Sequence, residues 1–405
     1  MKTKRSVLVF LAVCLAVRGV HEAARPFCDS YRELVVLLMH VWVILWRTVC
    51  QYIARGCRPR HPGWTFLLEC TQQVAFGIGS RYGHHLGCIR KAGLFRHNTA
   101  RLGRWMARVA CVQHRTEVEV FHHMGLEHLW LRAKRRQSQT STNKSPLLVV
   151  YYHGGGYSLL SPWFYVFFVT RLIDHLRREL GDDTDVQIVL PNFRKLPEHP
   201  LHAVVDDAMA MYHYIVETSG VSTDSVVVAG DSAGAGLVVS TLLGLRDEIK
   251  QPTTTGHDMP VAGICGCPLF DLLGRRDDRA KCILSDQLLD VLGQFAEPDS
   301  MTAQQAAAVK RLANLADCEL HDLPPLLIQV AEFDVVRKHG LVVAEKARAA
   351  GVDVTLEEHA DMPHTFFLFP TFMLPKSRDG IQSMAKFAVD HFRRRKATAQ
   401  AAPAC

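Results

Sequence analysis

From residue 146 onward, short apolar runs alternate with longer amphipathic segments, and this alternation restricts the fold more than any other feature of the chain. The apolar runs have the length of strands, and the amphipathic segments have the length and periodicity of helices. The expected strands are PLLVVYYH, VQIVLPNF, SVVVAGDS, VAGICGCPLF and PLLIQVAEFD, and the expected helices include FFVTRLIDHLRREL, AVVDDAMAMYHYIVET and GLVVSTLLGLRDEI. Strands that are apolar on both faces belong to a mainly parallel sheet with helices on both sides. The sequence therefore predicts an α/β fold with such a sheet.

Two further segments extend this pattern towards the N-terminus. Residues 115–124 (RTEVEVFHHM) alternate polar and apolar side chains, as a half-buried strand does, and HLWLRAK follows as a second strand candidate. We therefore expect one α/β domain over residues 115–398. The helix-biased stretch 272–322 is expected to form part of a lid.

The segment VVVAGDSAGAGL places Gly230, Asp231, Ser232, Ala233 and Gly234 between an apolar strand and a helix. This is the motif G-x-S-x-G, in which the serine occupies a sharp strand-to-helix turn and the small residues prevent crowding there. Because the strand and the helix are both present, a nucleophilic serine is favoured over a glycine-rich phosphate turn or a chance match. Ser232 is therefore the predicted nucleophile, and Asp231 is expected to have a structural role.

A serine hydroxyl is a poor nucleophile at neutral pH, so it needs a base and a group that orients the base. Asp334 and His364 follow the serine in the order nucleophile, acid, histidine, and both lie beyond the carboxyl ends of expected strands. We predict that they are the acid and the base. Glu332 remains an alternative acid, His359 is a weaker alternative base, and Asp361 is expected to shape the loop.

His153 precedes three consecutive glycines, Gly154, Gly155 and Gly156, at the end of an apolar run. Attack on an ester carbonyl produces an oxyanion that needs preorganised hydrogen-bond donors about 3 Å away. Glycine lets the backbone approach that oxygen, and the residue after the nucleophile supplies a further N–H group. The predicted donors are Gly155, Gly156 and Ala233, whereas His153 is expected to order the loop.

The N-terminal part of the chain is apolar and then basic. MKTKRSVLVFLAVCLAVRGV places basic residues before about a dozen apolar ones, and LVVLLMHVWVILW is a second apolar run at 34–46. Neither run reaches the roughly 18–20 apolar residues of a spanning helix. Together they favour a signal or membrane anchor within residues 1–55 over a cap helix packed on the catalytic domain. Residues 56–114 are expected to form a basic helical cap.

Charge and cysteine content argue against two other classes of site. The net charge is +7, with basic residues concentrated between Arg90 and Arg136, but no nucleic-acid-binding motif accompanies them. The 12 cysteines include no CxxC pair with zinc spacing, and the His pairs at 84–85 and 122–123 lack further ligands. We expect neither nucleic-acid binding nor a metal. Asn143 begins a glycosylation sequon that would be used only on a luminal surface.

With these motifs in place, residues 115–395 resemble the hormone-sensitive lipase family of α/β-hydrolases, the alpha/beta hydrolase fold-3 group. The resemblance rests on HGGG at 153–156, GDSAG at 230–234, PNFRKLPEHPLHAVVDDAMAMY at 191–212, and the segments around Asp334 and His364. The middle segment is similar to the family's YRLAPEHPFPAAVEDA, with Lys195 and Leu196 at its variable positions. The resemblance implies an α/β-hydrolase fold and hydrolysis of carboxylic esters without a cofactor or a metal.

The segment HPGWTFLLEC, at 61–70, is similar to one that precedes the catalytic domain in fungal members, including steryl acetyl hydrolases of the endoplasmic reticulum. This resemblance implies a deacetylase of the endoplasmic reticulum membrane or secretory pathway, acting on a hydrophobic alcohol such as a sterol or a secondary metabolite; a cytoplasmic location is the alternative. Two other functions stay open, namely a ligand-binding receptor on an inactive hydrolase scaffold and an acyltransferase. The presence of His364 in the expected loop argues against the receptor.

Overall fold

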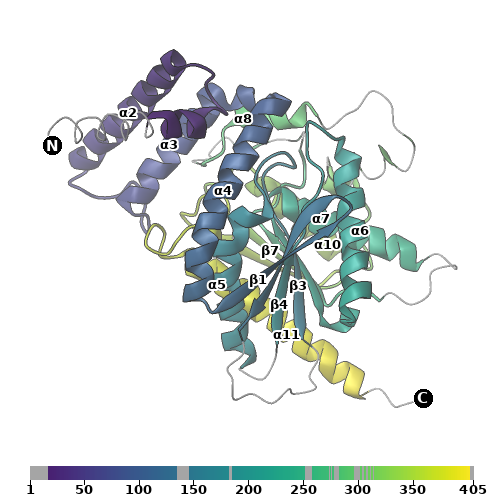
Figure 1. Cartoon of the computed structure of the whole chain (residues 1–405). Helices are drawn as coiled ribbons and strands as arrows, with labels where there is room; N and C mark the ends of the chain where they lie inside the picture. The colour runs from purple at the N-terminus through teal and green to yellow at the C-terminus, as the bar shows by residue number, and fades with distance from the viewer. Residues whose placement is uncertain are drawn as a thin grey trace, which may run out of the picture.

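The computed structural model describes residues 17–401, apart from 135–145, 182–184, 251–257, 273, 275, 278–281, 296–301, 303–304, 307–308, 311 and 313. The sequon at Asn143 therefore lies outside the described residues. At the centre is an eight-stranded sheet with the strand order β1-β2-β4-β3-β5-β6-β7-β8 (Figure 1). The strands are β1 (Thr116–His123), β2 (Leu126–Ala133), β3 (Leu147–Tyr152), β4 (Val186–Leu190), β5 (Val226–Asp231), β6 (Ala262–Gly266), β7 (Leu326–Ala331) and β8 (Val354–His359).

The sheet is mainly parallel, as the sequence predicts. β2 pairs antiparallel with both β1 and β4, and every other neighbouring pair is parallel. The central strands β3, β5, β6 and β7 are buried at every position, because helices cover both of their faces. The half-buried strand expected over 115–124 is confirmed as β1, in which buried or partly buried residues are interspersed with exposed ones.

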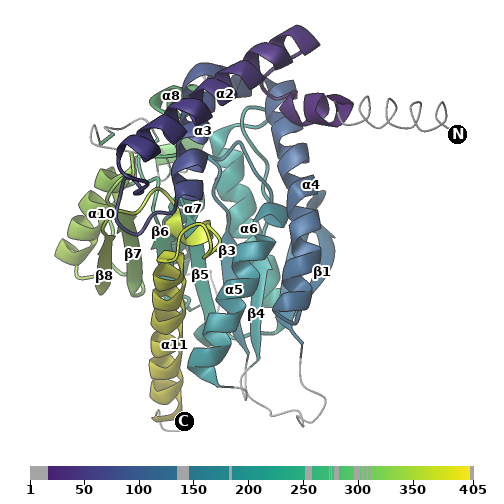
Figure 2. The ribbon, with the colours of Figure 1, turned by 90° about the vertical axis from the view of Figure 1, so that its left-hand side faces the viewer.

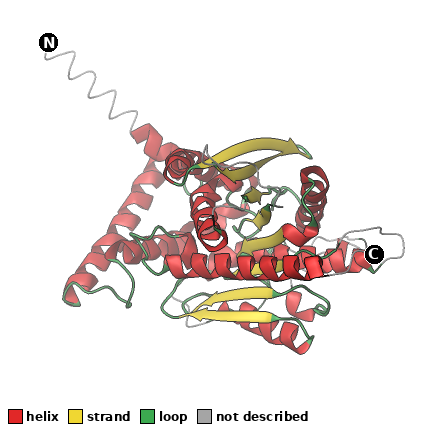
Figure 3. Ribbon diagram, turned by 90° about the horizontal axis from the view of Figure 1, so that it is seen from below, coloured by secondary structure: helices red, strands yellow, loops and turns green. Residues whose placement is uncertain are grey.

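Successive side chains of β3 enter two different cores, which shows how the helices are divided between the faces. Leu148 and Val150 pack with α6 (Leu201–Ser219), α7 (Ala233–Ile249) and α10 (Arg337–Ala349). Leu147 and Val149 pack with α5 (Pro162–Leu180) and α11 (Ser377–Ala401). Seen from below, helices lie on both sides of the sheet (Figure 3).

The N-terminal residues form a helical layer at one end of the molecule. Residues 17–24 are helical. The chain then forms α2 (Tyr31–Ala54), α3 (Phe66–Tyr82), the 3-10 helix η1 (Gly83–Gly87) and α4 (Ile89–Gln113). Ser30 and Thr65 begin α2 and α3, because their side-chain oxygens accept hydrogen bonds from the backbone N–H groups of Glu33 and Leu68. Figure 2 shows α2 and α3 at the same end of the molecule as α8 (Asp286–Gly293).

Three hydrogen bonds are among the contacts that tie this helical layer to the rest of the chain. The indole Nε1 of Trp64 donates to the carbonyl oxygen of Asp361 over 2.6 Å, and the Thr65 hydroxyl donates to that of Met373 over 2.6 Å. The amide of Gln72 donates to the carbonyl oxygen of Cys282 over 2.9 Å. The helical layer therefore contacts the segments that follow β8 and precede α8.

Helix α2 is longer than the apolar run from which it was expected. It has 24 residues and, by length and composition alone, is long and apolar enough to cross a membrane, with 17% of its most apolar window buried. The run at 34–46 is shorter because Arg47 interrupts it, yet the helix continues through TVCQYIA. Within the expected lid region 272–322, the structure describes α8 and the 3-10 helix η3 (Leu315–Asp317).

Candidate active site

Ser232 occupies the turn between β5 and α7, in the strained backbone conformation that the motif requires. Its φ of 51° and ψ of −122° lie outside the regions that residues with a side chain ordinarily adopt. The turn is held because the Ser232 N–H donates to the carbonyl oxygen of Gly266 over 2.9 Å, and the N–H of Leu269 donates to the Ser232 carbonyl oxygen over 3.0 Å. The side chain is 7% exposed.

The glycines on either side of this serine leave no room for a side chain. A Cβ atom at Gly230 would lie 2.5 Å from the carbonyl oxygen of Gly234, and one at Gly234 would lie 2.0 Å from that of Tyr152. Both neighbours are backbone atoms, so they do not move as the end of a flexible side chain does. The crowding expected from the sequence is therefore present at both positions.

Asp334 and His364 lie together, after the carboxyl ends of β7 and β8. The Nδ1 atom of His364 and the Oδ2 atom of Asp334 are 2.8 Å apart, and both residues are buried. The other carboxylate oxygen of Asp334 accepts a hydrogen bond from the backbone N–H of Val336 over 3.1 Å. Asp334 thus fixes one ring nitrogen of His364 and leaves Nε2 for another partner.

The alternative acid and base make other contacts. A carboxylate oxygen of Glu332 accepts a hydrogen bond from the backbone N–H of Asp361 over 2.8 Å, and the ring of His359 lies 3.4 Å from the Glu357 carboxylate. Asp361 also accepts the hydrogen bond from Trp64 through its carbonyl oxygen. The structure therefore brings Asp334, and not Glu332, into contact with His364.

Two buried thiols lie next to this acid–histidine pair. The Sγ atom of Cys282 is 3.9 Å from Oδ1 of Asp334, and burial raises the pKa of Cys282 to about 12. In the described part of the chain, Cys267, Asp334 and His364 form the one group of three possible metal ligands whose donor atoms lie within 4.8 Å of one another. Burial also raises the pKa of Cys267. Because His364 and Asp334 already bind each other, we interpret both thiols as packing around the acid–histidine pair.

The glycine-rich loop after β3 has the backbone conformation that only glycine adopts without strain. Gly155 has a φ of +117° and Gly156 a φ of +61°. A Cβ atom at Gly155 would lie 2.3 Å from the carbonyl oxygen of Leu159. Among the residues that the structure describes, none accepts a hydrogen bond from the N–H groups of Gly155, Gly156 or Ala233. These three donors are therefore available to a ligand.

Asp231 anchors the start of the glycine-rich loop through a hydrogen bond. Its carboxylate accepts hydrogen bonds from the hydroxyls of Tyr151 and Tyr165, over 3.0 and 2.9 Å, and from the backbone N–H of Gly154 over 3.1 Å. Burial raises the pKa of Asp231 to about 6, and the two tyrosine hydrogen bonds oppose this shift. Sequence reasoning missed both tyrosines. Nothing in the pattern VVYYHGGG distinguishes Tyr151 from ordinary strand residues, and Tyr165 lies in an apolar helical segment, α5, with no local signal that it contacts Asp231.

His153 is fully buried and contacts the same loop. Its Nδ1 donates to the carbonyl oxygen of Gly154 over 2.7 Å, and its ring stacks on Phe193 with a centroid distance of 4.6 Å. Burial, aided by the charge of Lys195, lowers the pKa of His153 to about 3, so the ring is neutral at ordinary pH. This geometry agrees with a role in ordering the loop.

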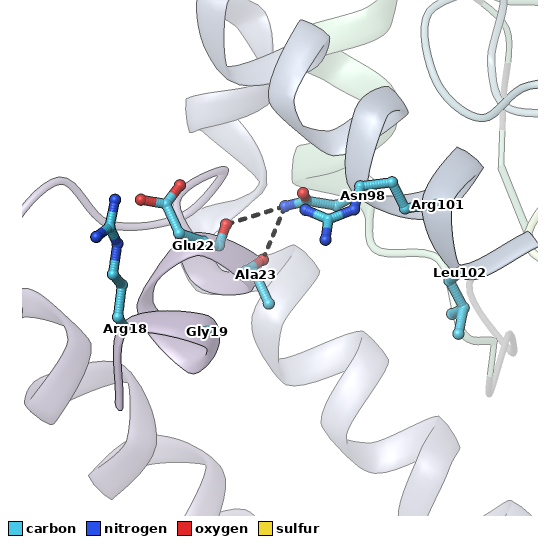
Figure 4. Close-up of a pocket in the computed structure, with 7 residues that line it drawn as sticks. All are labelled: Arg18, Gly19, Glu22, Ala23, Asn98, Arg101 and Leu102. Carbon is cyan, nitrogen blue, oxygen red and sulfur yellow. Dashed lines mark hydrogen bonds between the residues drawn. The ribbon is translucent and has the colours of Figure 1, made fainter. Parts of the chain in front are cut away.

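One surface pocket of the protein lies at the N-terminal helical layer and not at the predicted catalytic residues. It is lined by Arg18, Gly19, Glu22, Ala23, Asn98, Arg101 and Leu102, and it contains none of the predicted catalytic residues (Figure 4). Asn98 closes one side, because its amide donates to the carbonyl oxygens of Glu22 and Ala23 over 3.1 and 3.2 Å.

Comparison with known proteins identifies the family. The model of the alpha/beta hydrolase fold family matches residues 149–368, which is more than half of the chain. The chain belongs to the alpha/beta hydrolase fold family. The expectation of an α/β-hydrolase fold is thereby confirmed. The expectation of an enzyme of the carboxylesterase type is confirmed by relatives that are named acetyl-hydrolase, esterase and carboxylesterase.

The relatives of this family member include several named esterases. An acetyl-hydrolase of Streptomyces hygroscopicus is 32% identical over 261 residues, which are 64% of this chain and 78% of the relative. An esterase of Acinetobacter venetianus is 25% identical over the same shares of each chain. The solved structure of the esterase EstE5 superimposes with a TM-score of 0.58 at 24% identity, covering 75% of this chain and 98% of EstE5.

Proposed function

We propose that the protein hydrolyses carboxylic esters with Ser232 as the nucleophile. In this mechanism His364, oriented by Asp334, takes the proton from the Ser232 hydroxyl as its oxygen attacks the ester carbonyl carbon. The N–H groups of Gly155, Gly156 and Ala233 stabilise the oxyanion of the tetrahedral intermediate.

The second half of the reaction regenerates the enzyme. The intermediate collapses to an acyl-enzyme as the bond to the alcohol breaks, and His364 gives its proton to the departing alkoxide oxygen. His364 then takes a proton from a water molecule that attacks the acyl carbon, and Ser232 regains its proton when the acid leaves.

The single observation that carries this proposal is the hydrogen bond between His364 and Asp334. It links two residues 30 positions apart in sequence on two different loops, and it leaves the far ring nitrogen of the histidine for the serine. It also argues against a receptor on an inactive scaffold, because such a protein needs neither the base nor the group that orients it.

The test compares hydrolysis of p-nitrophenyl esters, from acetate to palmitate, by the wild-type protein and by Ser232→Ala. We expect release of p-nitrophenol by the wild type and a decrease of at least 1,000-fold in the variant. Hydrolysis that persists in a folded Ser232→Ala protein would contradict the proposal. Addition of a competing alcohol distinguishes acyl transfer, since an acyltransferase would form the new ester in place of the free acid.

We further propose that the acyl group is short, as in an acetyl ester, and that the alcohol is hydrophobic, such as a sterol or a secondary metabolite. The acetyl-hydrolase of Streptomyces hygroscopicus, whose name indicates removal of an acetyl group, supports the acyl part of this proposal. The apolar N-terminal helices support the alcohol part, because a substrate of low solubility is delivered from a membrane or another apolar surface.

A further part of the proposal is that residues 1–55 attach the protein to a membrane, that 56–114 form the cap and that 115–398 form the catalytic domain. Support comes from the outer face of α2, where Val35, Met39, Trp42, Trp46 and Ile53 recur at helical spacing and are all exposed. Trp42 and Trp46 are 63% and 58% exposed, and their rings stack. A soluble protein seldom exposes so large an apolar surface without a partner.

Charge supports a membrane with anionic lipids as the partner. Residues 17–114 contain 14 Lys and Arg against 4 Asp and Glu, whereas the rest of the described chain is acidic overall. Basic residues around an apolar helix favour the surface of an anionic bilayer. On this basis, and because 61–70 resembles a segment of endoplasmic reticulum enzymes, we propose the endoplasmic reticulum membrane or the secretory pathway as the location.

Vesicle flotation tests this part separately from catalysis. We expect the wild type to float with phosphatidylcholine vesicles that contain phosphatidylserine, and Trp42→Ser/Trp46→Ser to float several-fold less. Val342→Ser is the control, because Val342 is also exposed but lies on α10. Equal flotation of the double variant and the wild type would contradict attachment through α2.

A further inference from the structure

The side chain of Leu292, on α8, lies directly against the glycine-rich loop. A Cβ atom at Gly156 would lie 2.2 Å from Cδ1 of Leu292 and 3.5 Å from its Cγ. Leu292 is 2% exposed, so the leucine is packed at this position and does not sample solvent. One of its methyl groups therefore occupies the space beside a proposed oxyanion donor.

Helix α8 is held in place by the helical cap. Three glycines of the cap, at intervals of four residues, each face α8 or Ser285, the residue that caps its N-terminus. A Cβ atom at Gly79 would lie 3.0 Å from Oγ of Ser285, one at Gly83 would lie 3.4 Å from Cβ of Leu288, and one at Gly87 would lie 3.1 Å from Cγ1 of Val291. The absence of side chains at these glycines lets α8 approach the cap closely, which fixes the neighbouring Leu292.

The start of α8 is fixed as well. The Ser285 hydroxyl accepts a hydrogen bond from the backbone N–H of Leu288, and the guanidinium of Arg276 contacts the carboxylate of Asp290 at 2.7 Å. The carbonyl oxygen of Cys282, three residues before Ser285, accepts the hydrogen bond from Gln72 of the cap. The position of Leu292 relative to Gly156 is therefore set by contacts on both sides of α8.

The catalytic groups determine which part of an ester would meet Leu292. The alcohol oxygen must face His364, which protonates it, and the carbonyl oxygen must face Gly155, Gly156 and Ala233. The acyl chain takes the remaining direction from the carbonyl carbon. Leu292 contacts the loop that holds the oxyanion, whereas Cys282 and Cys267 lie next to the Asp334–His364 pair.

We propose that Leu292 limits the length of the acyl group and makes the site selective for short-chain acyl esters. This inference rests on the proposed function, because it concerns the substrate of the same site. The proposal places the acyl group against Leu292, whose buried side chain beside Gly156 would then collide with chains longer than an acetyl group. Such steric selection typically changes kcat/KM by 10- to 200-fold for each methylene group.

The test measures kcat/KM for p-nitrophenyl acetate, butyrate, hexanoate and octanoate with the wild type, Leu292→Ala and Leu289→Ala. We expect the ratio of hexanoate to acetate to rise about tenfold or more in Leu292→Ala. Leu289→Ala is the matched control, because Leu289 is a buried leucine of the same helix that packs in the core of the α7 face. It should lower the melting temperature and leave the ratio unchanged.

Three results would overturn the inference. The first is an unchanged ratio in a Leu292→Ala protein that retains its fold and its activity on acetate. The second is an equal shift in Leu289→Ala, and the third is a shift only when the alcohol is varied, with 1-naphthyl acetate against p-nitrophenyl acetate. If Leu292→Ala does not fold, Leu292→Val must give a smaller shift in the same direction. Failure of the proposed function is distinguishable, since it would show as activity that Ser232→Ala retains.

Discussion

Replacement of Lys195 by methionine should stabilise the protein at neutral pH and remove part of its dependence on pH. Lys195 is 7% exposed; its Nζ donates to the Asn192 side chain and, over 3.0 Å, to the carbonyl oxygen of Phe193, and it lies 4.4 Å from the centroid of the Phe193 ring. Burial, aided by the nearby charge of Arg96, lowers the pKa of Lys195 from 10.5 to about 7.

The sign of the effect follows from the two pKa values. Between pH 7 and about 10.5 the unfolded chain holds a proton that the folded chain has lost, so the free energy of unfolding increases as pH rises through this window. At pH 7 and below, burial of the charged form costs up to roughly 5 kcal/mol. The folded-state pKa of Lys195 already includes the stabilisation of the charged form by its hydrogen bonds and its aromatic contact. Methionine has a similar unbranched side chain but carries no charge.

Urea unfolding at pH 7 and pH 9 measures the difference in the free energy of unfolding between the variant and the wild type. We expect Lys195→Met to be more stable than the wild type at pH 7, and the advantage to shrink by about 2 kcal/mol at pH 9. Lys386→Met serves as the control for the loss of a lysine charge as such, because Lys386 is exposed on α11. A pH-independent difference for Lys195→Met, or an advantage that grows with pH, would refute the reasoning.

Three shorter predictions concern the site and its supports. Asp334→Asn should lower kcat by about 10,000-fold with little change in KM, because the histidine loses its orientation; steady-state kinetics in which kcat falls less than tenfold would contradict this role. Gly234→Ala should yield little folded protein, since its Cβ would lie 2.0 Å from the carbonyl oxygen of Tyr152; a melting temperature equal to that of the wild type would show that the turn can relax. Trp64→Phe loses the hydrogen bond to Asp361 and should lower the free energy of unfolding by about 1 kcal/mol, which chemical denaturation measures; unchanged stability would mean that this contact contributes nothing.

The residues that the sequence located best are those whose environment is local. The strand, the serine turn and the helix around Ser232 are adjacent in the chain, so the motif and its flanks predict the conformation that the structure has. Asp334 and His364 were predicted from chain order and strand ends, because parallel strands place their carboxyl ends at one edge of the sheet. The structure distinguishes between the two candidate acids, because Asp334, and not Glu332, is hydrogen-bonded to His364.

The features that the sequence did not indicate depend on contacts between distant segments. Tyr151 and Tyr165 bind Asp231 because α5 packs across β3, which no local pattern encodes. Leu292 reaches Gly156 only because the cap fixes α8. The burial of Lys195 likewise comes from tertiary packing, because the sequence alone predicts that a lysine in a polar segment is exposed.

Covalent labelling of the nucleophile tests the central claim most directly. The protein would be treated with a fluorophosphonate, which phosphonylates activated serine hydroxyls with release of fluoride, and the modified peptide would be identified by mass spectrometry. The account predicts one adduct, on Ser232, with labelling reduced at least 100-fold in a folded His364→Ala protein because the base is missing. Labelling of another serine, or equal labelling of Ser232 without His364, would contradict it.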